Sequence, residues 1–172
     1  MAKYLGNVSG KLKEIQPVST SAGAGDSGKL AQLDGTGRFD ISFMPVGVGA
    51  EVSIMVTSEN LTAGDFVNIY NNGGTITGRK ADATTNAKPA NGFTLSNVTS
   101  PANVTIYGIS NKNTALSGLT LGAEYYLSTT AGGVTATAPS AAGNVVQFLG
   151  KAESTSALVF SGSGTYDFEL IA

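Results

Sequence analysis

The sequence predicts an all-β protein: a small, internally duplicated β-barrel or β-sandwich that follows an extended N-terminal arm. Three observations predict this fold. The chain of 172 residues has 23 Gly and only 13% charged residues, a composition that favours turns and pleated strands over exposed helices. Short alternating apolar runs are bounded by Gly or Pro, which is typical of strands. A pattern of turn and strand also occurs twice along the chain.

Residues 1–49 are predicted to form the arm. They are dense in Gly, Ser and short polar residues, and no apolar periodicity continues for more than a few residues. Such a segment cannot bury enough of itself to offset its ordering entropy, so we expect it to lie against a partner chain. Its expected partner contacts are the apolar side chains of Phe39, Ile41, Phe43, Met44 and Val46. The alternative is that these five side chains pack under the protein's own β domain.

Residues 50–172 are predicted to form the β domain. Residues 50–57 alternate as a strand does, which places Val52, Ile54 and Val56 on one face, and we expect the core to begin there. The last run, residues 166–170, also alternates. We expect it either to finish the sheet or to pair with a neighbouring subunit.

The β domain is predicted to contain two similar halves, at about residues 58–110 and 116–162. Each half has a Leu-Thr-x-Gly sequence, a strand and then a Gly-Gly step, at Gly73-Gly74 and at Gly132-Gly133. A Gly-Gly step supplies the positive φ angles of a tight hairpin, so the first two strands of each half should pair antiparallel. Further strands are expected after a Pro-containing loop in each half, at residues 93–98, 104–109, 145–150 and 158–160.

Charge and composition exclude several functions. Ten basic and twelve acidic residues give a net charge of -2 and a pI near 5.0, so we expect no direct binding to nucleic acid. The absence of Cys and His removes thiolate and imidazole chemistry, so we expect no metal, no cofactor and no catalytic triad. The longest uncharged stretch, residues 125–150, is broken by Gly and Pro, so no membrane span is expected.

Three motifs resemble chemical sites without completing them. Residues 23–30 approach a phosphate-binding loop, but Leu30 stands where a Mg²⁺-binding hydroxyl belongs. Residues 34–40 lack the spacing of acids in a calcium loop and are predicted to form a turn. A pair of catalytic carboxylates is the remaining alternative, and its candidates are Asp65, Asp82, Glu124 and Glu153. Since the chain has no Trp for sugar stacking, we predict that it is not an enzyme.

Two stretches resemble tailed-phage proteins. The residues GKLAQLDGTGRFD (28–40) and MPVG (44–47) resemble a segment that is frequent in tailed-phage structural proteins. The residues LTLGAEYYLSTTAGGV (119–134), with Pro139 and GNVVQFLG (143–150), are similar to modules of phage head-decoration and fibre proteins. The resemblance implies a capsid decoration, or cement, protein: a homotrimer on the outer surface of the virion that binds the major capsid protein and stabilises the head. The second module is shared with fibre and spike proteins, so host attachment is the alternative function.

Overall fold

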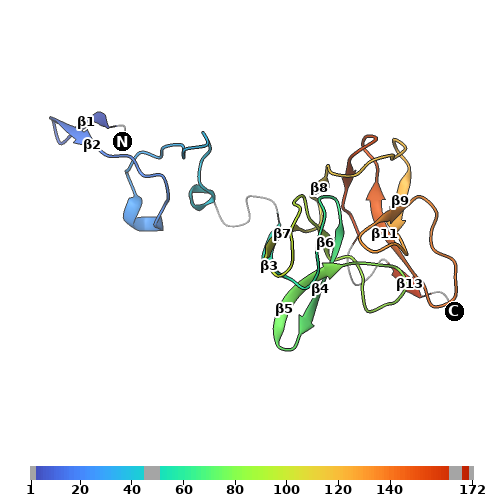
Figure 1. Ribbon diagram of the computed structural model, residues 1–172. Helices are drawn as coiled ribbons and strands as arrows, with labels where there is room; N and C mark the ends of the chain where they lie inside the picture. Colours follow the sequence, from blue (N-terminus) through green and yellow to red (C-terminus); the bar gives the residue numbers. More distant parts are fainter. Residues whose placement is uncertain (1–2, 45–50, 163–167, 171–172) are drawn as a thin grey trace. The chain divides into compact units, whose positions relative to one another are not determined.

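A computed structural model of the chain describes residues 3–44, 51–162 and 168–170 (Figure 1). The chain divides into two units, Met1–Gly49 and Ala50–Ala172. Within the described ranges the regular structure consists of strands and two short 3₁₀ turns, with no α-helix, so the prediction of an all-β protein is confirmed. No helix in these ranges is long and apolar enough to cross a membrane.

The first unit begins with a β-hairpin that we did not predict. Strand β1 (Tyr4–Val8) pairs antiparallel with β2 (Lys11–Ile15). Ser9 and Gly10 form the two-residue turn between them, with φ angles of 55° and 79°. Two left-handed residues in succession match the right-handed twist of a hairpin, which explains why this short dipeptide reverses the chain.

The rest of the first unit contains short turns joined by backbone hydrogen bonds. The 3₁₀ turn η1 (Gly23–Asp26) lies within a loop that is closed by a bridge between Val18 and Ala31, in which the Val18 N–H donates to the Leu30 carbonyl at 2.9 Å. The 3₁₀ turn η2 (Ile41–Phe43) lies near the end of the described part of the unit. Polar contacts hold these turns, because Pro17 is the only buried residue in the described part of this unit.

The second unit begins with five strands whose pairing closes on itself, in the order β3-β5-β4-β6-β7 and back to β3. The pairing of β3 with β5 is parallel, and the other pairings are antiparallel. We refer to these strands as the ring: β3 (Val52–Thr57), β4 (Phe66–Asn72), β5 (Thr75–Lys80), β6 (Gly92–Phe93) and β7 (Asn103–Tyr107). The strand expected at residues 93–98 is therefore much shorter than predicted, and Val98 instead forms an isolated bridge with Leu61.

The turn at Gly73-Gly74 joins β4 and β5 as predicted. Asn72 pairs with Thr75, and the two glycines between them have φ angles of 61° and 95°. The turn residues therefore determine the register of this hairpin.

The outer face of β3 corrects one expectation. Val52, Ile54 and Val56 do share a face, but all three are exposed, and the core does not begin with them. The side chains that face inward are Met55, which packs on a small buried cluster, and Thr57, which is 1% exposed. Alternation predicts which residues share a face, but it does not decide which of two faces is covered.

The remaining strands form a second group. One sheet has the order β10-β9-β11-β13, and β8 pairs with β12. The bounds are β8 (Lys112–Asn113), β9 (Glu124–Leu127), β10 (Val134–Thr135), β11 (Val145–Lys151), β12 (Leu158–Val159) and β13 (Phe168–Leu170). Strand β13 pairs with β11, so the last run finishes this sheet.

The second Gly-Gly step differs from the first. Strands β9 and β10 do pair antiparallel, as predicted, with Leu127 opposite Val134. The connection between them is the six-residue segment 128–133, so the predicted tight two-residue turn at Gly132-Gly133 is wrong. Glycine is required at position 132 because its φ of 79° is in the left-handed region and a Cβ atom there would be 2.5 Å from a carboxylate oxygen of Asp65. The Gly132 N–H donates to the Ala81 carbonyl at 2.7 Å.

Two buried clusters stabilise the second unit. The larger one lies between the ring and the second group of strands, where Phe66 contacts Phe93 and Phe160 with ring centroids 6.0 and 5.5 Å apart. The smaller one lies among the ring strands and consists of Leu61, Val67, Val104 and Ile106. Gln147 on β11 connects the two groups, because its buried amide exchanges hydrogen bonds of 2.7 and 2.8 Å with the backbone of Ala90. The two groups of strands therefore share one core.

Candidate functional site

The candidate site is the segment from Phe39 to Met44, which the sequence predicted to contact a partner. A tight turn precedes it. The Asp34 carboxylate accepts hydrogen bonds from the Thr36 N–H and hydroxyl at 2.8 and 2.7 Å and from the Arg38 N–H at 3.0 Å. The Thr36 hydroxyl and the two N–H groups hold the pKa of Asp34 below its usual value. The prediction of a turn over residues 34–40 is confirmed, and it positions Phe39.

A second acidic residue shapes the segment itself. The Asp40 carbonyl accepts the Phe43 N–H at 3.1 Å, and the Asp40 carboxylate accepts the Ser42 N–H at 2.9 Å. Hydrogen bonding from Ser42 lowers the pKa of Asp40. The Ser42 hydroxyl in turn accepts the Ser21 N–H at 2.7 Å, which ties the segment to the earlier part of the same unit.

The segment presents aromatic and aliphatic side chains to the surface. The rings of Phe39 and Phe43 meet edge to face, with centroids 6.1 Å apart and an interplanar angle of 72°. Phe39 is 53% exposed, Met44 is 41% exposed, and Phe43 is half-buried. The structure therefore brings two of the five predicted contact residues into one aromatic pair, with Met44 directly after it. The side chain of Ile41 and the whole of Val46 lie outside the described residues.

The hairpin carries further apolar side chains that the sequence reasoning missed. Leu5 on β1 and Leu12 on β2 are 77% and 76% exposed. The available signal was the Ser9-Gly10 dipeptide between two runs that each contain apolar residues, because Ser-Gly is a turn-forming pair. Phe39 and Met44 are thus part of a wider group of exposed apolar residues in the first unit.

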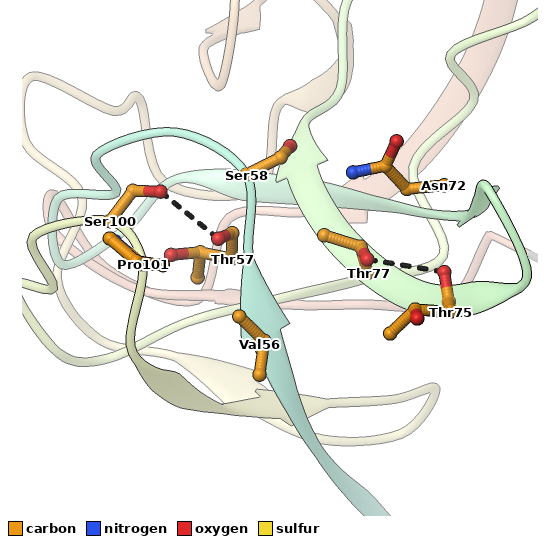
Figure 2. A pocket seen from close by; sticks show the side chains of 8 residues that line it. All are labelled: Val56, Thr57, Ser58, Asn72, Thr75, Thr77, Ser100 and Pro101. Carbon is orange, nitrogen blue, oxygen red and sulfur yellow. Dashed lines mark hydrogen bonds between the residues drawn. The ribbon is translucent and has the colours of Figure 1, made fainter.

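The second unit has an open pocket on the ring (Figure 2). Its volume is about 480 Å³, and its lining is uncharged: Val56, Thr57, Ser58, Asn72, Thr75, Thr77, Ser100 and Pro101. The Ser100 hydroxyl donates to the Thr57 carbonyl at 3.0 Å, and the Thr77 hydroxyl donates to the Thr75 carbonyl at 3.2 Å, as the dashed lines in Figure 2 show. The pocket offers hydroxyl and amide groups for hydrogen bonding, but none of its lining residues can act as a general acid or base near neutral pH.

The four carboxylates considered as catalytic candidates each pair with a separate lysine. Asp65 lies 3.1 Å from Lys80, Asp82 lies 2.9 Å from Lys88, and Glu124 lies 3.5 Å from Lys151, all measured from carboxylate oxygen to Nζ. Glu153 pairs with Lys112. Each acid therefore has a structural partner of its own. Among the described residues, no three acidic side chains form a group that could hold a metal ion.

The phosphate-loop-like stretch adopts a different structure from a nucleotide site. Residues Gly23–Asp26 form η1, and the Asp26 carboxylate accepts the Ala22 N–H and pairs with Lys29, each at 2.5 Å. A phosphate-binding loop needs free backbone N–H groups and an uncommitted lysine at the start of a helix. Here the lysine is paired with an acid, and no α-helix follows among the described residues.

The described part of the first unit therefore consists of ordered turns that expose Phe39 and Met44 and a hairpin that exposes Leu5 and Leu12. Comparison with protein-family models and with curated proteins found no match for the chain.

Proposed function

We propose that this chain is a structural, non-enzymatic protein that decorates the outer surface of a tailed-phage capsid and stabilises it by binding the major capsid protein. The observation that carries the proposal is the contrast between the two units. The second unit exposes some apolar residues, such as Ile54 and Leu121, but it has a large buried core, whereas the described part of the first unit has no such core and leaves Phe39, Met44 and several other large apolar side chains exposed. Apolar side chains that a unit does not bury itself are available to a partner.

The proposed mechanism is stabilisation by binding. A protein that binds the closed shell but not its separated subunits lowers the free energy of the closed state, in the same way that a ligand stabilises the fold it binds. Extended segments and hairpins suit this role because they contact neighbouring subunits through backbone hydrogen bonds and a few apolar side chains. We propose that the chain acts as a homotrimer, which fits the three-fold positions of an icosahedral shell.

Internal duplication of the second unit is part of the proposal. Both Leu-Thr-x-Gly sequences form the same turn: the Asp65 N–H donates to the Thr62 carbonyl, and the Ala123 N–H donates to the Thr120 carbonyl. The glycine of each Leu-Thr-x-Gly sequence has a positive φ angle, which is 97° at Gly64 and 77° at Gly122. The strand that follows is flanked by two neighbours in each half, in the orders β5-β4-β6 and β10-β9-β11. These equivalences support two copies of one ancestral β unit, each serving as a scaffold.

The proposal is tested with Met44→Asp in the full-length chain. A carboxylate at a buried apolar contact is costly, so we expect the affinity for emptied phage heads that lack this chain to fall by at least about 10-fold. Binding is measured by co-sedimentation with the heads, and near-UV circular dichroism checks that the fold is intact.

Leu121→Asp is the matched control, because Leu121 is 70% exposed in a turn of the second unit. It should bind heads as the unchanged chain does. Failure of the unchanged chain to bind heads would contradict the decoration role itself. Equal binding by Met44→Asp would contradict the contribution of the Phe39–Met44 segment.

A fibre or spike component that attaches to the host is the second candidate. The hydroxyl-lined, uncharged pocket on the ring favours it, since Asn72 and Thr75 have side-chain hydrogen-bonding groups without a partner among the described residues. Neutral polar groups of this kind suit a neutral sugar, although the pocket has no aromatic ring for stacking. A fibre component would bind intact host cells and leave emptied heads unbound.

A further inference from the structure

The hairpin formed by β1 and β2 carries the most exposed large apolar side chains of the described chain. Leu5 and Leu12 are 77% and 76% exposed, whereas Leu127 and Leu149 in the second unit are fully buried. An isolated two-stranded hairpin is at best marginally stable in water, and it normally needs a third strand or a packed face. The exposed leucines therefore mark the face of the hairpin that is available for a partner.

The pairing register defines this face. Leu5 lies opposite Glu14, and Asn7 lies opposite Leu12. Directly opposed residues share a face of a two-stranded sheet, and residues two apart in a strand share it as well. We call these four residues the leucine face. The Glu14 carboxylate lies 2.5 Å from the Nζ of Lys3, so the charge on this face is balanced.

The opposite face of the hairpin is basic. Its residues are Tyr4, Gly6, Val8, Lys11, Lys13 and Ile15. Ile15 already lies over Gly6, because a Cβ atom at Gly6 would be 2.2 Å from the Cδ1 of Ile15. Lys11 and Lys13 form no ion pair with a carboxylate in the part of the chain that the structure describes. The hairpin thus combines a face with two exposed leucines and a balanced charge with two lysines that have no ion-pair partner among the described residues.

We propose that the leucine face docks into an apolar groove of the major capsid protein, and that carboxylates at the rim of this groove pair with Lys11 and Lys13. This inference rests on the proposed decoration function and names the element that makes the contact. Long lysine side chains can reach past the hairpin edge while their charged ends stay at a wet rim. Charge complementarity of this kind selects the partner and fixes the orientation of the hairpin.

A second copy of the chain is a poorer match for the hairpin. Four carboxylates of its β domain, those of Asp65, Asp82, Glu124 and Glu153, already pair with lysines of the same domain. Glu59 accepts the Lys80 N–H, so among the acidic side chains that the structure describes in the second unit, Glu51 is the one left to offer Lys11 or Lys13. An anionic lipid surface is a poorer match as well, because lipid binding normally uses a larger cluster of basic residues. The hairpin has only two unpaired lysines, and its third lysine, Lys3, is paired with Glu14.

The decisive variant is the double substitution Leu5→Thr with Leu12→Thr in the full-length chain. Threonine favours strands, so the hairpin is retained while its apolar face is removed. We expect affinity for emptied phage heads to fall by roughly 100-fold, because each leucine loses its apolar burial. Leu121→Thr is the matched control, because Leu121 is 70% exposed in the second unit and lies outside the hairpin, and it should bind heads unchanged. Lys11→Gln with Lys13→Gln should weaken binding at low salt and reduce its dependence on ionic strength.

The outcomes separate this inference from the proposed function. If the unchanged chain does not bind heads, the decoration function fails, and the inference fails with it. If the unchanged chain binds heads and the double leucine variant binds equally well, the inference is overturned while the function stands. A variant that keeps head binding but loses self-association in sedimentation experiments would assign the leucine face to a second copy. Retained head binding with lost binding to anionic phosphatidylserine vesicles would assign it to lipid. Either result would overturn the proposal.

Discussion

At the scale of single residues, Asp82 shows how a carboxylate orders the loop that follows β5. Burial of the carboxyl raises its pKa, but hydrogen bonds from Thr84 and Lys88 outweigh burial, so the pKa of Asp82 is lowered overall. The Asp82 N–H also donates to the Lys88 carbonyl at 3.1 Å, which closes the loop on itself. The side chain and the backbone of Asp82 therefore act on the same loop.

Asp82→Asn is expected to lower the free energy of unfolding of the full chain by about 1–3 kcal/mol, because the charged hydrogen bonds and the ion pair with Lys88 are lost. Glu153→Gln is the matched control. The Glu153–Lys112 pair is about half-exposed on both sides, and exposed pairs contribute only about 0–1 kcal/mol. Urea denaturation at neutral pH measures both variants. An equal loss in the two would contradict the structural role of Asp82.

The same carboxylate predicts a pH dependence. Since the pKa of Asp82 in the folded chain lies below its unfolded-state value of 3.8, its contribution to stability is fully present above that value. The contribution is lost as the pH falls through the lower folded pKa. Asp82→Asn should therefore flatten the dependence of unfolding free energy on pH in the acid range, relative to the unchanged chain.

At the scale of elements, the turn between β4 and β5 is determined by its two glycines. A Cβ atom at Gly73 or Gly74 would meet no other atom within 4 Å, so any cost of substitution there comes from the backbone. Gly73→Asn creates Asn-Gly, the pair preferred in this type of turn, and we expect unchanged or slightly higher stability. Gly74→Ala should cost about 1–2 kcal/mol, because its φ of 95° is strained for a residue with a side chain. Thermal unfolding of the two variants distinguishes these effects, and equal melting temperatures would contradict them.

Elements with a strong local signal were predictable from the sequence. The Gly73-Gly74 step encodes its own hairpin because positive φ angles are required at both positions, and alternation located β3, β7 and β11 to within a few residues. The longer loop before Gly133 was not predictable, because Gly132 is fixed by a hydrogen bond to Ala81, which is distant in the sequence. The exposure of Ile54 could not be inferred either, because alternation does not show which face of β3 other strands cover.

The candidate site was predictable only in part. Phe39, Phe43 and Met44 stand out in the sequence as apolar residues within a polar segment, and the aromatic pair agrees with their proximity in the chain. The leucines of the hairpin were missed because Leu5 and Leu12 become neighbours on one face only after the Ser9-Gly10 turn brings the strands together. Composition predicted an arm without regular structure, and a single dipeptide was sufficient to give part of it a hairpin.

At the scale of the whole molecule, burial and charge are distributed unequally between the two units. Among the residues that the structure describes, the hydrophobic side chains of the buried core run from Leu61 to Phe160. Half of the basic residues but only four of the twelve acidic residues lie in the first 49 positions. The first unit is therefore slightly basic, with exposed apolar side chains, and the second is acidic, with an internal core. This division agrees with our proposal that the first unit contacts the capsid and that the second unit is a folded domain held on the capsid surface by the first.

Removal of residues 1–49 tests this division. Because the buried clusters consist of residues beyond Gly49, the truncated chain should fold and unfold with a free energy of unfolding within about 1 kcal/mol of the full chain. The same truncation should abolish binding to emptied heads, since it removes both Phe39–Met44 and the hairpin. Urea denaturation and head co-sedimentation measure the two properties separately. If the truncated chain does not fold, the first unit is needed to complete the core. If the truncated chain folds and still binds heads, the binding surface lies on the β domain and not on the first unit.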